Sequence, residues 1–218
     1  MQTINFFMKK AIFTTIIVCF AAAGYSQHLA VNLYGGYTFQ DKVSYDGSGL
    51  GGYAHADIHG GFMWGVSVEG INRMGSGAEL VYQYQGTNIP VYSQNGNNLN
   101  PDNNSATISY LLLNGMHYFN QGAKAEPYFG LGLGIGFLTT HPQDGSASAS
   151  AEKFAWDLKT GVLIHATDKI GIKIGAQLIT ASIASSTYYY PYYGYVSYYS
   201  ALYQFGFTGG LVFKFGGH

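Results

Sequence analysis

The chain has 218 residues and a formal net charge of −1, and only 10% of its residues are charged, whereas 17% are aromatic and 31 are glycine. A water-soluble domain usually carries about 25% charged residues, so this composition argues against a soluble domain, and no basic patch points to a nucleic-acid partner. The absence of an apolar run of about 20 residues argues against a helical membrane protein.

Residues 1–26 have the layout of a cleavable secretory signal peptide. Lys9 and Lys10 form a short basic region, and an apolar run of 13 residues follows at 11–23. Small residues then precede Gln27, where we expect cleavage. A retained membrane anchor is disfavoured, because a span needs about 20 apolar residues.

Cys19, the only cysteine, lies inside this apolar run. The predicted mature chain, 27–218, therefore has no disulfide, no cysteine metal site and no thiol nucleophile. Lipidation of Cys19 is disfavoured because the branched Val18 precedes it, where lipoprotein signals have a small residue. With the signal removed, 8 basic and 11 acidic residues leave a net charge of −3.

The mature chain shows period-two alternation of apolar and polar or small residues, which indicates β-strands. In 127–138, Phe129, Leu131 and Leu133 share one face, and glycines occupy most of the other. A narrow barrel explains the bare face, because its inward side chains compete for little space. The predicted strands are 29–39, 61–69, 79–85, 108–119, 127–138, 154–164, 170–178 and 203–215. Leu111-Leu112-Leu113 leaves the facing of 108–119 unassigned.

The connections between these strands alternate in length. Short connections are expected around 72–76, 120–126 and 166–169, and long ones at 40–54, 86–106, 140–152 and 180–200. Short turns on one side and long loops on the other are typical of outer-membrane barrels, and closure removes the unpaired edge that lipid would not tolerate. The sequence therefore predicts an all-β protein, an eight-stranded antiparallel up-and-down transmembrane β-barrel over 27–218.

The segments Ile108–Phe119 and Pro127–Leu138, joined by a short turn, resemble the centre of the small outer-membrane β-barrel family, which includes OmpA-like transmembrane domains and PorT-like proteins. The resemblance implies location in a Gram-negative outer membrane, with membrane lipid and the barrel-assembly machinery as partners. Family barrels commonly end on an aromatic residue, and Phe215 is the nearest match here. A peptidoglycan-binding role is not implied, since no segment for it follows the barrel.

Six charged residues fall on predicted inward faces. Buried charges must be paired or hydrated, so they form either a polar conduit for small solutes or ions, or an ion-paired plug. The plug is favoured, because eight strands enclose little more than their own side chains. These residues are Glu69, Glu79, Asp157, Lys159, Lys173 and Lys214.

The last long connection, 180–200, is rich in tyrosine. A tyrosine ring is stiff and apolar with a polar tip, which suits the binding of an extracellular glycan or protein. The same chemistry suits an aromatic girdle at the membrane interface, and both interpretations stay open. The central residues are the candidate ligand-binding set: Tyr189, Tyr190, Tyr192 and Tyr193.

Metal binding is a weaker hypothesis. His55, Asp57 and His59 alternate on one strand and are acceptable zinc ligands, but side chains along one strand stay parallel instead of converging. An asparagine-rich run at 95–104 could offer oxygen ligands to calcium, yet Asp102 is its only carboxylate and a solvated loop is favoured. We expect no metal and no cofactor.

Catalysis is also disfavoured. His117, His165 and several serines are present, but no predicted strand pair sets a nucleophile beside a base, so no catalytic residue is assigned. The sequence favours a structural or surface-binding protein that acts through its extracellular loops. Transport through a narrow barrel is the alternative, followed by a membrane-embedded hydrolase.

Overall fold

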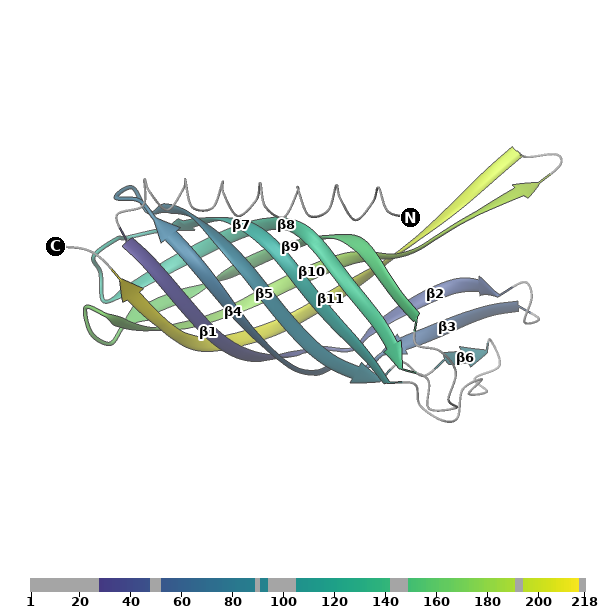
Figure 1. Ribbon diagram of the computed structural model, residues 1–218, viewed down its shortest axis with the longest axis horizontal. Coiled ribbons are helices and arrows are strands. Elements are labelled where there is room, and N and C mark those ends of the chain that lie inside the picture. Colours follow the sequence, from purple (N-terminus) through teal and green to yellow (C-terminus); the bar gives the residue numbers. More distant parts are fainter. Residues whose placement is uncertain are drawn as a thin grey trace, which may run out of the picture.

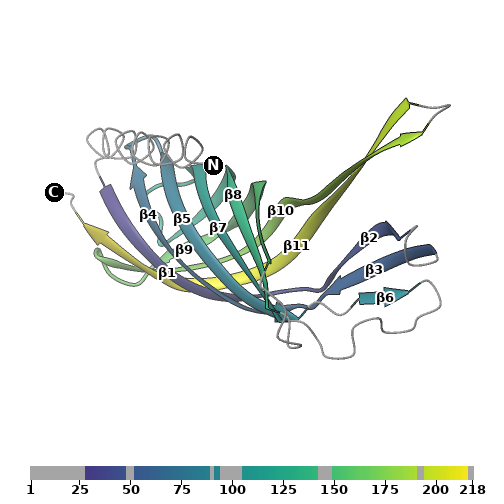
Figure 2. The same ribbon diagram turned by 45° about the vertical axis from the view of Figure 1, so that its right-hand side comes forward.

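The computed structural model describes residues 28–47, 52–88, 91–93, 105–141, 149–190 and 194–215. Eight antiparallel strands close into a barrel in the order β1-β11-β10-β9-β8-β7-β5-β4, which confirms the predicted fold class (Figures 1 and 2). The described ranges contain no helix long and apolar enough to cross a membrane. The barrel strands are β1 (His28–Thr38), β4 (Gly61–Ile71), β5 (Ser76–Asn88), β7 (Ser105–Tyr118), β8 (Ala125–His141), β9 (Ala149–His165), β10 (Ile170–Tyr190) and β11 (Gly194–Phe215).

Side chains alternate between the barrel interior and its exterior along each strand. On β7, whose facing the sequence left open, Ile108, Tyr110 and Leu112 are buried in the interior, whereas Leu111 and Leu113 are exposed on the outside. Both faces of this strand are apolar near Leu111–Leu113, so apolar and polar residues do not alternate there. The closed ladder sets the register instead.

Short turns connect the strands at one end of the barrel. In the turn from β4 to β5, Asn72 Oδ1 accepts hydrogen bonds from the backbone N–H groups of Met74 and Ser76, at 2.9 and 3.1 Å. Gly75 completes this turn with a φ of +78°, a left-handed conformation that glycine adopts without steric cost. β1 begins and β11 ends at this same end, where Leu29 pairs with Phe215.

At the other end, the strands run on beyond the barrel. A separate three-stranded sheet contains β2 (Asp41–Gly47), β3 (Gly52–Ile58) and β6 (Val91–Ser93). β10 and β11 continue as a two-stranded hairpin that projects away from the barrel (Figure 1). The predicted loops 40–54 and 180–200 are therefore largely strands. Backbone hydrogen bonding between two strands needs only a neighbouring strand, so it can continue beyond the part of the barrel that crosses the membrane.

The barrel exterior is apolar on every strand. Eight outward-facing apolar residues, one from each barrel strand, have exposed fractions between 39% and 68%, so they are not part of a core. A closed barrel with such a surface suits the hydrocarbon of a membrane, where every backbone polar group must be paired internally. These eight residues, one from each barrel strand in chain order, are Leu33, Phe62, Tyr82, Leu113, Leu133, Phe154, Ile174 and Phe207.

The interior is layered along the barrel axis. One apolar cluster, which includes Val81, Leu112 and Ile179, lies in the half nearer the projecting strands, where the amides of Gln83, Gln85 and Gln204 are buried beside it. A second cluster, which includes Met116 and Leu163, fills the end with the short turns. Charged side chains from inward positions of β4, β5, β9 and β10 form a layer between the two clusters.

Several predictions fall on other parts of the chain. The signal peptide at 1–26 and the whole asparagine-rich run at 95–104 lie outside the described residues. Both therefore stay predictions.

Candidate functional site

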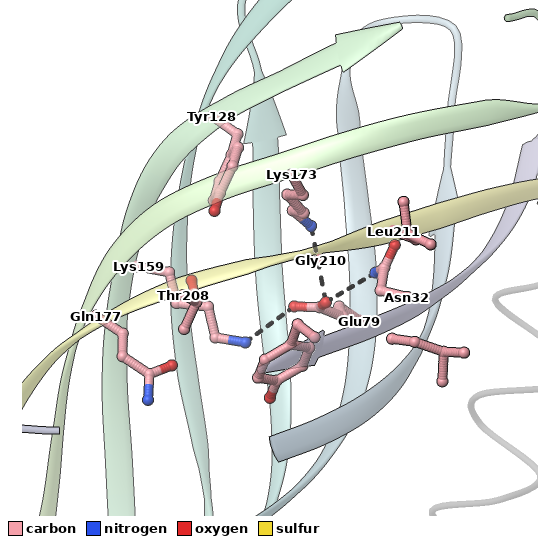
Figure 3. Close-up of a pocket in the computed structure, with 11 residues that line it drawn as sticks. Asn32, Glu79, Tyr128, Lys159, Lys173, Gln177, Thr208, Gly210 and Leu211 are labelled. Carbon is pink, nitrogen blue, oxygen red and sulfur yellow. Dashed lines mark hydrogen bonds and ion pairs between the residues drawn. The ribbon is translucent and has the colours of Figure 1, made fainter. Parts of the chain in front are cut away.

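The layer between the two apolar clusters is built on two short ion pairs. Lys159 Nζ lies 3.1 Å from Glu79 Oε2, and Lys173 Nζ lies 3.1 Å from Glu69 Oε2. Longer contacts join Lys173 to Glu79 at 3.7 Å and Lys159 to Asp157 at 3.6 Å. Figure 3 shows Lys159, Lys173 and Asn32 converging on Glu79. We call these five charged residues, Glu69, Glu79, Asp157, Lys159 and Lys173, the charged layer.

Neutral groups donate further hydrogen bonds to the carboxylates of Glu69 and Glu79. Asn32 Nδ2 donates to Ser67 Oγ at 2.8 Å, to Glu79 Oε1 at 3.1 Å and to Glu69 Oε2 at 3.2 Å. Ser67 Oγ donates to Glu79 Oε1 at 2.6 Å, and the Tyr118 hydroxyl donates to Glu69 Oε1 at 2.6 Å. Such satisfied partners are what a buried ion pair needs to offset its loss of hydration.

Aromatic rings enclose the second ammonium group. Lys173 Nζ lies 4.7 Å from the centre of the Tyr128 ring and 5.4 Å from that of Tyr118, within the range of cation–π attraction. Asn32, Ser67 and these tyrosines were not predicted from the sequence as members of the layer. Their inward position could be read from the alternation, but their partners lie on strands far away in the sequence.

Little free space remains within the charged layer. A cavity of about 30 Å³ is bordered by Glu79, Tyr128, Lys159, Lys173 and Gln177 (Figure 3). That volume holds one or two water molecules, since one water needs about 10–15 Å³ of such space. A larger solute does not fit in this cavity.

Lys214, the sixth predicted interior charge, does not join the charged layer. Its Nζ lies 2.7 Å from His165 Nδ1, and His165 Nε2 lies 3.0 Å from Glu126 Oε1. If the ammonium donates to Nδ1, the imidazole proton is on Nε2 and is shared with Glu126. These groups form a second, smaller network beside the short turns. The sequence analysis missed Glu126 because it was placed in a turn.

The projecting hairpin carries the candidate tyrosines. Tyr189 pairs with Tyr195, well beyond the last pairing of β10 with β9, which joins Ala181 to Ala155. For Tyr189 and Tyr190 the structure describes the backbone alone. Tyr192 and Tyr193 lie outside the described residues.

No protein-family model and no curated protein sequence matches the chain. Solved structures do match it. Outer membrane protein OprG from Pseudomonas aeruginosa aligns with a TM-score of 0.60 and 14% identity over 88% of this chain and 98% of that chain. Neisserial surface protein A gives 0.53 and 12% over 87% and 98%, and a major outer membrane protein from Thermus thermophilus gives 0.55 and 8% over 86% and 99%.

The fold is that of a small outer-membrane β-barrel. Identities this low show the fold alone, so the expected resemblance is confirmed for the kind of barrel, and a specific likeness to OmpA-like or PorT-like proteins stays a prediction. The closed ladder and the apolar exterior on all eight strands place the protein in an outer membrane.

One expectation about catalysis was wrong. β5 and β7 set Ser76 opposite His117, and Ser76 Oγ lies 3.1 Å from His117 Nδ1. This is a serine beside a base, although the sequence analysis expected none. Within the described residues, no carboxylate contacts this imidazole, which packs edge-on against Phe119 instead. The pair therefore lacks the acid that would orient a catalytic histidine.

The zinc motif lies outside the barrel wall. His55 and Asp57 belong to β3 of the small sheet, and His59 follows this strand. Among the described side chains, no group of three or more His, Cys, Asp or Glu residues could hold a metal ion.

Proposed function

We propose that this outer-membrane barrel does not conduct solutes and acts at the cell surface through its projecting strands, above all the β10–β11 hairpin. The observation that carries the proposal is the contrast between the two halves of the molecule. The interior is filled by the charged layer, whereas two strands extend far beyond the rim. Recognition concentrates naturally on segments that a rigid scaffold holds out in solvent.

The interior supports a structural role for the buried charges. Each ammonium of the charged layer lies 3.1 Å from a carboxylate, and a cluster of buried apolar residues lies on either side of the layer. An ion that entered would have to break these pairs in a cavity that holds one or two water molecules. The transport alternative has no comparable support.

We therefore expect the purified protein to show no steady conductance in planar lipid bilayers. The double variant Glu79→Ala/Lys159→Ala shortens both side chains of the central ion pair and should open small, flickering currents where it folds. Long-lived, well-resolved channels in the wild type would refute the non-conducting proposal, and their ion selectivity should then change with Lys173→Ala.

A surface role for the hairpin is supported by its distance from the aromatic girdle. Barrel residues already provide ring contacts near the rim: Phe39 stacks on Phe205 at 6.0 Å, and Trp64 stacks on Tyr84 at 5.7 Å. The ladder between β1 and β11 ends at Gly206 on the side of the hairpin. Tyr195 lies eleven residues before Gly206, which is about 35 Å along an extended strand. The hairpin tyrosines are therefore not needed for the girdle.

Alanine at Tyr189, Tyr190, Tyr192 and Tyr193 should leave the barrel folded and shifted in mobility on unheated gels, but should reduce attachment to a surface ligand. A glycan and protein array probed with wild type and variant measures this. Tyr203→Ala is the control, because this residue is 54% exposed on the barrel wall itself. Loss of folding in the fourfold variant, or unchanged binding across the array, would remove the hairpin from the proposal.

A further inference from the structure

An unusual pair of polar side chains lies at the edge of the charged layer. Asp157 and Asn114 are almost fully buried, with exposed fractions of 0% and 1%. Asn114 Nδ2 donates to Asp157 Oδ2 at 3.2 Å. The remaining oxygens, Asn114 Oδ1 and Asp157 Oδ1, are both buried and accept no hydrogen bond from any described group. Buried polar atoms without partners are rare, so these two need an explanation.

The two unpartnered oxygens share one small space. Gly132 on β8 pairs with Asn114 on β7 and with Asp157 on β9, so all three occupy one inward row. A Cβ atom built on Gly132 would collide with both Oδ1 atoms. The missing side chain at Gly132 therefore lets the amide and the carboxyl group meet across the intervening strand.

Two acceptor oxygens that meet in a buried space repel each other unless a hydrogen lies between them. Turning the amide over does not remove the conflict, because it would set the amide oxygen 3.2 Å from Asp157 Oδ2 instead. A protonated carboxyl group resolves both orientations. It donates through one oxygen to the amide oxygen and accepts the amide N–H through the other, as in a cyclic acid–amide dimer.

The balance of charges in the layer also favours a protonated Asp157. Glu69, Glu79 and Asp157 supply three carboxyl groups, whereas Lys159 and Lys173 supply two ammonium groups. Each ammonium has a glutamate at 3.1 Å, and Asp157 has only the more distant contact with Lys159, at 3.6 Å. A neutral Asp157 leaves two ion pairs and no excess charge inside the barrel.

We propose that Asn114 and Asp157 form a proton-binding site, in which the folded barrel holds one proton between the two Oδ1 atoms at neutral pH. The proton makes the charged layer electrically neutral, so no counter-ion is drawn into the lumen. This inference stands on the interior geometry and does not depend on a surface role for the hairpin.

The test uses the full mature chain refolded into micelles of an amine-oxide detergent, which has no carbonyl group of its own. A protonated carboxyl group gives an infrared carbonyl band distinct from that of a carboxylate, and this band should be present in wild type at pH 7 and absent in Asp157→Asn and Asn114→Ala. Wild type without the band would overturn the proposal, whether or not either variant folds.

Urea unfolding against pH gives an independent measure. The unfolded chain releases the Asp157 proton above about pH 4, whereas the folded site keeps it, so this group destabilises the fold as pH rises. The unfolding constant of wild type should then rise about tenfold per pH unit more steeply than that of Asp157→Asn. The matched control Glu152→Gln changes an exposed carboxylate on the same strand and should follow wild type. Equal slopes for wild type and Asp157→Asn would refute the bound proton.

Discussion

Replacing Glu79 with alanine should lower the free energy of unfolding by about 3–5 kcal/mol, the largest effect we expect from a single change in the interior. Glu79 accepts hydrogen bonds from Lys159, Ser67 and Asn32 and lies 3.7 Å from Lys173. Its removal leaves Lys159 without its closest carboxylate in a buried layer. The cost is that of a buried, uncompensated charge, and not merely that of one lost contact.

Urea unfolding in lipid vesicles measures this effect, with Glu152→Ala as the control. Glu152 is a carboxylate on the exposed side of β9, so its replacement should change stability by less than about 0.5 kcal/mol. A double-mutant cycle with Lys159→Ala isolates the pairwise energy. If Glu79→Ala costs no more than Glu152→Ala, the charged layer contributes little to stability.

Replacing Leu133 with arginine should cost about 2–4 kcal/mol, because this side chain faces the hydrocarbon near the middle of β8. Leu133 is 57% exposed, and in a water-soluble protein an arginine there would be tolerated. In lipid, the guanidinium must lose its hydration or distort the bilayer around it.

Met74→Arg is the matched control for Leu133→Arg. Met74 is even more exposed, at 80%, but it lies in the turn between β4 and β5, where we expect water. Unfolding of both variants in vesicles should show a loss for Leu133→Arg and almost none for Met74→Arg. Similar losses would mean that the apolar exterior of β8 does not face lipid.

Much of the barrel could be predicted because the alternation of apolar residues with polar or small ones shows which side chains face outward. In 127–138 the apolar residues and glycines separate cleanly, and Leu131 and Leu133 do lie outside. The facing of Leu111-Leu112-Leu113 could not be predicted, because a strand that is apolar on both faces shows no alternation between apolar and polar residues. The ladder with β5 and β8 decides its facing.

The site was harder to predict than the wall. The inward position of a charge follows from local alternation, but its partner follows from barrel closure. Lys214 shows the difference: it is on an inward position, yet its height along the barrel puts it beside His165 instead of the charged layer. The acid–amide pair depends on Gly132, whose role appears only when β7, β8 and β9 are side by side.

The charged layer also restricts how the chain can enter a membrane. Its ion pairs join β4 and β5 to β9 and β10, across 104 residues for Lys173 with Glu69 and 80 residues for Lys159 with Glu79. Contacts of such long range form late, after the loops between them have been closed. A half-inserted, open sheet would carry these four charges into the hydrocarbon without partners. We therefore expect insertion of the strands to be coupled to closure of the barrel, so that these charges meet their partners as they enter the membrane.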